Sequence, residues 1–133
     1  MKKLLFFLLW PCISFGQQLQ TRYEKTGGKE TATYAECIAF YKQLDQRSEL
    51  VQMKAYGNTD AGFPLHLVLV SADKDFDIAS LKRKKKTIIF VNNGIHPGEP
   101  DGIDASMQLV RDVVEKRFTL PNNVVLALLP VYN

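Results

Sequence analysis

The stretch TIIFVNNGIHPGEPDG, residues 87–102, joins an apolar strand pattern to a polar loop that is rich in glycine and proline. Residues 87–91 are almost wholly apolar, which is typical of a strand that is buried on both faces of a sheet. A helical pattern follows the loop. Open α/β sheets bind ligands in the loops that leave the carboxyl ends of their strands. We therefore expect residues 92–102 to carry the chemistry of this protein.

The hydrophobic periodicity on either side of this stretch predicts further helices and strands. They are a helix over 33–47, strands over 50–56 and 65–71, a helix over 102–116 and a strand over 124–131. Thr33 and Glu36 have the spacing of a capping box, which marks the start of the first helix. The strand, helix and strand at the end of this order predict two parallel neighbours. The predicted fold class is α/β, with a mixed, partly parallel sheet and helices on both faces.

The composition indicates one packed domain. The chain has 133 residues, of which 46% are hydrophobic and 23% charged, and this excludes disordered and collagen-like classes. Without the first 16 residues it holds 15 basic and 14 acidic residues. This near-neutral balance gives no reason to expect a nucleic-acid partner.

The first 16 residues have the pattern of a secretory signal peptide. Two lysines precede the apolar run of residues 4–10, and small residues stand one and three positions before Gln17. We expect a secreted or periplasmic protein with no stable membrane span after cleavage. The alternatives are a retained anchor or a lipid attached to Cys12. Cleavage would leave Cys37 without an internal partner, and residues 17–32 read as a loose, polar lead-in.

His96 and Glu99 are the candidate metal ligands of the loop. Imidazole nitrogen and carboxylate oxygen both bind zinc, and Gly98 between them permits a tight reversal that brings them together. A second interpretation is a loop histidine that hydrogen-bonds a carboxylate or caps the following helix. The only other histidine, His66, lies within a predicted strand and reads as a strand-face residue.

Three stretches resemble zinc carboxypeptidases of the carboxypeptidase A type. They are YGNTDAGFPL at 56–65, IFVNNGIHPGEPDG at 89–102 and LPVYN at 129–133. The first is similar to that family's turn between its first two strands. The second contains the His-x-x-Glu metal motif, and the third resembles the end of the Pro-x-x-Asn segment. The resemblance covers residues 34–133 and identifies them as the amino-terminal part of such a catalytic domain.

The resemblance implies an eight-stranded mixed sheet with one Zn²⁺, for which His96 and Glu99 are the first two ligands. The family's third ligand, its general-base glutamate and its substrate-binding arginines correspond to positions downstream of residue 133. No catalytic residue is therefore assigned, and the substrate-binding residues are unknown. The expected activity is hydrolysis of carboxyl-terminal peptide bonds, with peptide or protein carboxyl termini as partners. The chain alone is expected to be inactive.

Other interpretations remain open at this point. A zinc deacylase of acylated amino acids on the same fold would use the same His-x-x-Glu motif. A non-catalytic module would use the basic run of residues 82–86 to contact an anionic surface. The apolar final strand, with no helix after it, predicts an incomplete domain. It leaves open whether the chain is a truncated gene product or a natural short protein.

Overall fold

The computed structural model describes residues 18–96 and 98–133, so the predicted signal peptide lies outside the described residues. The elements are α1 (Arg22–Lys25), α2 (Tyr34–Arg47), β1 (Val51–Asn58), β2 (Pro64–Ser71), α3 (Ile78–Arg83), β3 (Thr87–Asn92), α4 (Asp101–Val114) and β4 (Val124–Leu129). All predicted helices and strands are present, and the short helices α1 and α3 are additional. Among the described residues, no helix is both long and apolar enough to cross a membrane.

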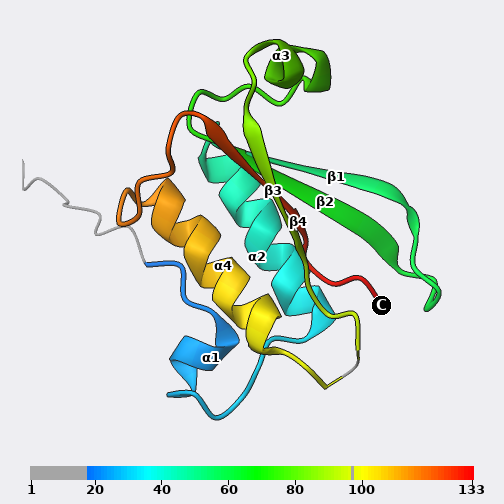
Figure 1. Ribbon diagram of the computed structural model, residues 1–133. Coiled ribbons are helices and arrows are strands. Elements are labelled where there is room, and N and C mark those ends of the chain that lie inside the picture. The colour runs from blue at the N-terminus through cyan, green and yellow to red at the C-terminus, as the bar shows by residue number, and fades with distance from the viewer. Residues whose placement is uncertain (1–17, 97) are drawn as a thin grey trace, which may run out of the picture.

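The strands form one mixed sheet in the order β1-β2-β4-β3. β1 and β2 make an antiparallel hairpin, β2 pairs antiparallel with β4, and β3 pairs parallel with β4. Figure 1 shows the long helices α2 and α4 side by side against one face of this sheet. The predicted parallel pair is confirmed. β1, β3 and β4 consequently run in the same direction, and the turn after β1 and the segments after β3 and β4 lie at the same end of the sheet.

The core lies between the two long helices and the sheet. α2 begins at Thr33, whose side chain accepts a hydrogen bond from the Glu36 amide while the Glu36 carboxylate accepts one from the Thr33 amide. This is the predicted capping box, which satisfies amides that a helix start leaves unpaired. Alternate residues of the central strands face the helices and are buried. The buried cluster includes Phe40, Leu44, Val68, Val70, Met107, Val110, Leu126 and Leu128.

β3 is an edge strand, and the prediction that it is buried on both faces is wrong for the described residues. Ile88, Ile89 and Phe90 are exposed by 47%, 46% and 59%. An apolar run is typical of a central strand, but burial also needs a neighbour on each side and a layer on each face. Among the described residues, β3 pairs only with β4. β4, in contrast, lies between β2 and β3 and is buried as the sequence predicts.

The lead-in is more ordered than the sequence predicts. Thr21 caps the single helical turn α1 and is itself buried. Arg111 of α4 is 3% exposed, donates to the carbonyl of Leu19 at 3.0 Å and forms an ion pair with Glu24. A buried guanidinium requires such partners, because taking a charge out of water is otherwise costly. These contacts tie residues 19–24 to α4.

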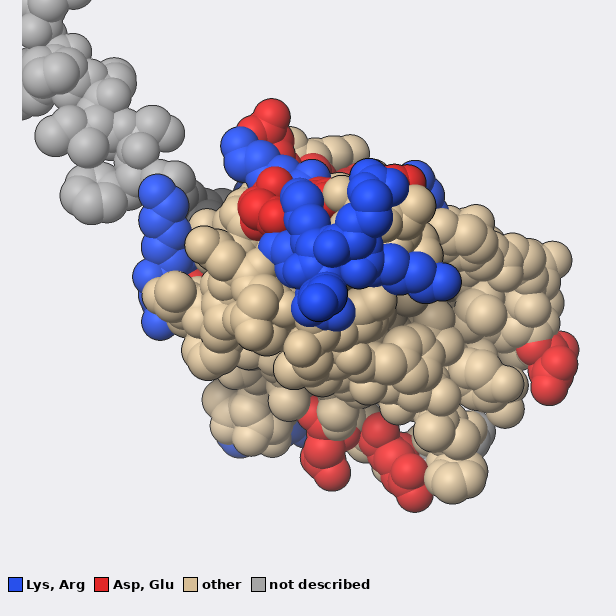
Figure 2. All heavy atoms as spheres, turned by 45° about the horizontal axis from the view of Figure 1, so that its top comes forward, with Lys and Arg blue, Asp and Glu red and all other residues tan. Residues whose placement is uncertain are grey.

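The basic run of residues 82–86 lies at the end of α3 and in the turn that enters β3. In Figure 2, lysine and arginine side chains gather on this face beside acidic ones. Lys84 pairs with Asp73 at 3.2 Å and Asp75 at 2.6 Å, and Lys86 pairs with Asp73 at 2.7 Å. Hydrogen bonds from Lys84 and Ser80 lower the pKa of Asp75 to about 2. Two of the five basic residues therefore serve local ion pairs.

Ile88 and Val125 are neighbours across the parallel pair and lie on the same face, yet they differ in burial. Val125 is fully buried. We expect Val125→Ala to lower the free energy of unfolding by about 2 kcal/mol, because a buried cavity forms. Ile88→Ala removes one more carbon atom than Val125→Ala does. It should nevertheless lower the free energy of unfolding by less than about 1 kcal/mol, because about half of the Ile88 side chain is already exposed to water. Urea denaturation of both variants checks this, and an equal loss would contradict the edge position of β3.

The ion pair of Glu24 and Arg111 makes stability depend on pH. Burial alone would raise the pKa of Glu24, but the hydrogen bonds from Arg111 and Thr21 hold it below its ordinary value of 4.5. A carboxyl group whose pKa is lowered by folding stabilises the folded state at pH values above its pKa in the unfolded chain. This stabilisation is lost as the pH falls through the pKa of the group in the folded state. We expect Glu24→Gln to be less stable than the parent chain in urea at about pH 7 and the difference to shrink by about pH 3.

Glu115→Gln is the matched control, because it removes only a partly exposed ion pair with Arg117. Such pairs contribute about 0 to 1 kcal/mol. If Glu24→Gln were less stable than the parent chain by the same amount at the acidic pH as at neutral pH, the ionised carboxylate of Glu24 would have no stabilising role.

Candidate metal site

The three stretches singled out in the sequence meet at one edge of the sheet. After β3, the Asn93 carbonyl accepts from the Tyr132 amide at 2.8 Å, and the Gly94 carbonyl accepts from the Asn133 amide at 3.1 Å. Tyr132 and Asn133 in turn line a cavity of about 80 Å³ together with residues of the turn after β1. The start of the loop, at Asn93 and Gly94, therefore lies against the segment after β4, at the carboxyl ends of two parallel strands. Ligand sites of open α/β sheets lie in this position.

Asn93 fixes the start of the loop against α4. It is 6% exposed, and its side-chain amide donates to the Ser106 hydroxyl at 3.0 Å. A Cβ atom at Gly102 would lie 2.7 Å from the Asn93 side-chain oxygen, which is closer than real contacts allow. Glycine at residue 102 is therefore what lets the first turn of α4 approach β3. The positioning role of Asn93 and Ser106 has no local sequence signal, because their contact joins residues 13 positions apart.

Gly94 sets the direction in which the loop leaves the sheet. Its φ angle is +61°, a left-handed conformation that glycine adopts without the steric cost other residues incur. A Cβ atom there would stand 3.2 Å from side-chain carbons of both Ile103 and Val131. The loop thus passes close to the start of α4 and to the segment after β4, and its next residues reach the surface.

His96 and Glu99 lie together at the tip of this loop. The distance from His96 Nδ1 to Glu99 Oε2 is 3.2 Å, and the two side chains are 71% and 70% exposed. Zinc with tetrahedral ligands at about 2.1 Å holds neighbouring donor atoms about 3.4 Å apart. The observed separation and the imidazole and carboxylate donors therefore fit two ligands of one metal. The same distance also fits a hydrogen bond, which is the second interpretation given by the sequence.

The described residues bring together two candidate metal ligands and no complete set. Within residues 18–96 and 98–133, no group of three or more histidine, cysteine, aspartate or glutamate side chains is arranged to hold a metal ion. Catalytic zinc sites in proteins use three protein ligands and keep one position open. The structure brings the two sequence-predicted candidates together, and it adds no third candidate.

His66 takes the strand position that the sequence predicts. It lies in β2, where its Nδ1 is 3.4 Å from the Tyr34 hydroxyl. Burial lowers the pKa of His66, and the nearby Lys42 acts in the same direction. His66 is therefore a partly buried residue of the sheet, and it serves as a natural control for experiments on His96.

Known proteins resemble this chain in sequence and in fold. The sequence profile of the family described as zinc carboxypeptidase matches residues 37–133. No curated protein matches significantly. Among solved structures, carboxypeptidase A from Helicoverpa armigera superposes with a TM-score of 0.62 at 18% identity, covering 75% of this chain and 24% of that one. Bovine thrombin-activatable fibrinolysis inhibitor, in complex with tick carboxypeptidase inhibitor, gives 0.60 at 18% identity, covering 77% and 31%.

The contact of Gly102 with Asn93 can be tested by a double-mutant cycle. Alanine normally favours a helix over glycine by about 1 kcal/mol. In the parent chain we expect Gly102→Ala to be destabilising instead, because the new Cβ displaces the Asn93 side chain from Ser106. In an Asn93→Ala background, which removes the obstructing oxygen, Gly102→Ala should be neutral or stabilising. Free energies of unfolding measured for the four proteins give the coupling, and additive effects would contradict this contact.

Proposed function

Because this chain belongs to the zinc carboxypeptidase family, we propose that it supplies two zinc ligands, His96 and Glu99, to a metallocarboxypeptidase active site. The observation that supports the proposal is the 3.2 Å approach of two exposed donors on a loop at the carboxyl end of β3. The chain spans about a quarter to a third of the length of the carboxypeptidases it superposes on. The activity of a whole enzyme is accordingly part of the proposal.

The roles of this chain's own residues follow from their chemistry. The imidazole of His96 and the carboxylate of Glu99 present one nitrogen and one oxygen donor from the same loop tip. Asn93 and Gly94 hold the base of that loop against α4 and the segment after β4. When bound, zinc polarises a peptide carbonyl and lowers the pKa of a coordinated water to about 7.

The proposed substrate class is a peptide or protein with a free carboxyl terminus. Hydrolysis of its last peptide bond also needs a third metal ligand, a general base and a cationic partner for the substrate carboxylate. Among the described residues, no third histidine, cysteine, aspartate or glutamate joins His96 and Glu99 to complete a metal-binding group. We therefore expect no peptidase activity from the described residues alone. Activity would require these groups from further sequence.

Zinc titration of the full chain tests the proposed ligands. We expect weak 1:1 zinc binding by isothermal titration calorimetry, because two ligands hold a metal less firmly than three. His96→Ala and Glu99→Gln should each reduce the affinity by about tenfold or more, since half of the donor set is lost.

His66→Ala is the matched control, because it removes the other histidine of the chain at a site distant in sequence from the loop. It should leave the affinity unchanged. Zinc binding that survives in His96→Ala but disappears in His66→Ala would contradict the proposed site. Circular dichroism of each variant confirms that the fold is retained.

A further inference from the structure

The segment that contains α3 and enters β3 carries the excess positive charge of the molecule. Residues 73–86 contain six basic and three acidic side chains. The rest of the chain after residue 16 contains nine basic and eleven acidic side chains, so it is slightly negative. Figure 2 shows lysine and arginine side chains gathered on the face that α3 occupies. The charge of the chain is therefore unevenly distributed, although its sum is close to zero.

Three basic side chains on this face are available to a partner. Two of the five basic residues in 82–86 serve the local ion pairs described above. The other three, Lys82, Arg83 and Lys85, are exposed, and no described residue forms an ion pair with them. The amide of Lys85 donates to the carbonyl of Lys82 at 3.0 Å, so both residues belong to one tight turn at the end of α3. Lys82, Arg83 and Lys85 are called the basic patch below.

An exposed apolar side chain stands beside the basic patch. Ile78 is 54% exposed and precedes Lys82 by four residues, so the two side chains lie on the same face of α3. Leu81, which is 1% exposed, faces the interior instead. Basic side chains beside an exposed apolar one are typical of helices that bind at a lipid surface, where the cations meet phosphate groups and the apolar group leaves water. A polyanion in water offers nothing to an apolar side chain.

We propose that the basic patch and Ile78 bind the surface of a bilayer that contains anionic phospholipids. Lysine presents a compact point charge, whereas arginine forms paired hydrogen bonds with one phosphate. Four of the five basic residues in 82–86 are lysine, which suits a diffuse anionic surface. Each basic residue near such a surface raises the binding constant about fivefold, so the three residues of the patch contribute about a hundredfold.

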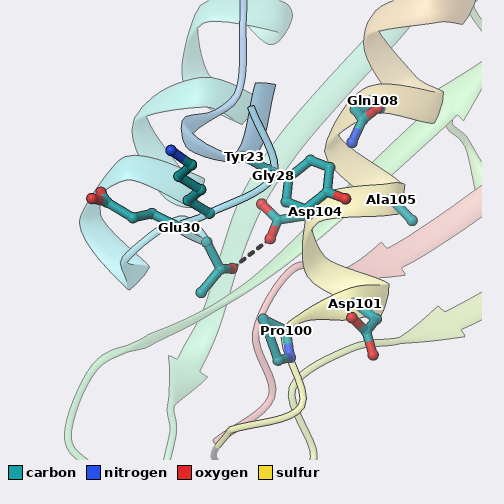
Figure 3. Close-up of a pocket in the computed structure, with 10 residues that line it drawn as sticks. Tyr23, Gly28, Glu30, Pro100, Asp101, Asp104, Ala105 and Gln108 are labelled. Carbon is teal, nitrogen blue, oxygen red and sulfur yellow. Dashed lines mark hydrogen bonds between the residues drawn. The ribbon is translucent and has the colours of Figure 1, made fainter. Parts of the chain in front are cut away.

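The opposite end of β3 is acidic, which orients the molecule on such a surface. Figure 3 shows Glu30, Asp101 and Asp104 around the start of α4. Because α3 precedes β3 and α4 follows it, these carboxylates and the basic patch lie at opposite ends of this six-residue strand (Figure 1). The strand spans about 20 Å, and charges beyond about 8 Å are largely screened at physiological salt. The acidic end therefore leaves the attraction intact, and the loop tip with His96 and Glu99 faces away from the bilayer.

Paramagnetic nuclear magnetic resonance of the full chain on lipid nanodiscs tests the proposal. The discs contain phosphatidylglycerol and phosphatidylcholine in equal parts, with a trace of gadolinium-bearing lipid. The apolar run of residues 4–10 can hold any variant at a disc, so the readout is the broadening of single amide signals rather than total binding. We expect strong broadening at Ile78, Lys82 and Lys85 and little at Gly94. Discs of phosphatidylcholine alone, or about 0.5 M salt, should remove the broadening at α3.

Variants of the surface test its two components. Lys82→Gln, Arg83→Gln and Lys85→Gln combined should reduce the broadening at Ile78 by about tenfold or more. Ile78→Ser should reduce the broadening at Lys82 by about threefold, because less apolar surface is withdrawn from water. If the combined variant fails to fold, Lys82→Gln alone decides, with an expected reduction of about fivefold, and no reduction there overturns the proposal.

The matched control combines Lys25→Gln, Lys29→Gln and Lys54→Gln, which make the same charge change at exposed lysines of the lead-in and β1. Broadening at α3 should stay within about twofold of the parent. The proposal is overturned if the control loses as much broadening as the basic-patch variant, or if neutral discs broaden α3 equally. A short DNA duplex replaces the discs in a further titration. Saturable shifts at the basic patch that Ile78→Ser leaves unchanged would identify a soluble polyanion and overturn the lipid proposal.

Discussion

The close approach of α4 to the end of β3 is the contact on which the rest of the structure depends. Gly102 has no side chain, and Asn93 uses the space to reach Ser106 on the next turn of the helix. A buried amide must be hydrogen-bonded, so this contact fixes both the strand end and the helix start. The same strand end accepts hydrogen bonds from residues 132 and 133. One small area thus joins β3, α4 and the segment after β4.

The start of α4 contacts different segments on its two sides as a consequence. On one side, the loop leaves Gly94 and presents His96 and Glu99 to solvent rather than packing them into the core. On the other side, Asp104 accepts a hydrogen bond from the Thr31 hydroxyl of the lead-in. Arg111, further along α4, adds its contacts with Leu19 and Glu24, so the lead-in is held against the helix on this side.

Local sequence patterns predicted the features that local physics controls. The capping box at Thr33, the parallel pairing of β3 with β4 and the proximity of His96 to Glu99 each depend on residues close in sequence or on a general rule of chain connection. The burial of β3 was predicted wrongly, because an apolar run does not say whether neighbouring strands are present. Arg111 forms hydrogen bonds with Leu19, 92 positions earlier in the chain, and with Glu24, 87 positions earlier. No local sequence pattern could indicate contacts over such separations.

The most direct test of these conclusions is a crystal structure of the full chain grown with zinc, with anomalous scattering recorded at the zinc edge. We predict one anomalous peak at the loop tip, with a nitrogen of His96 and an oxygen of Glu99 both about 2.0 to 2.2 Å from it, and with Asn93 still bonded to Ser106. Zinc bound to only one of the two side chains, or bound elsewhere while the hydrogen bond from His96 to Glu99 remains, would contradict the proposed metal site.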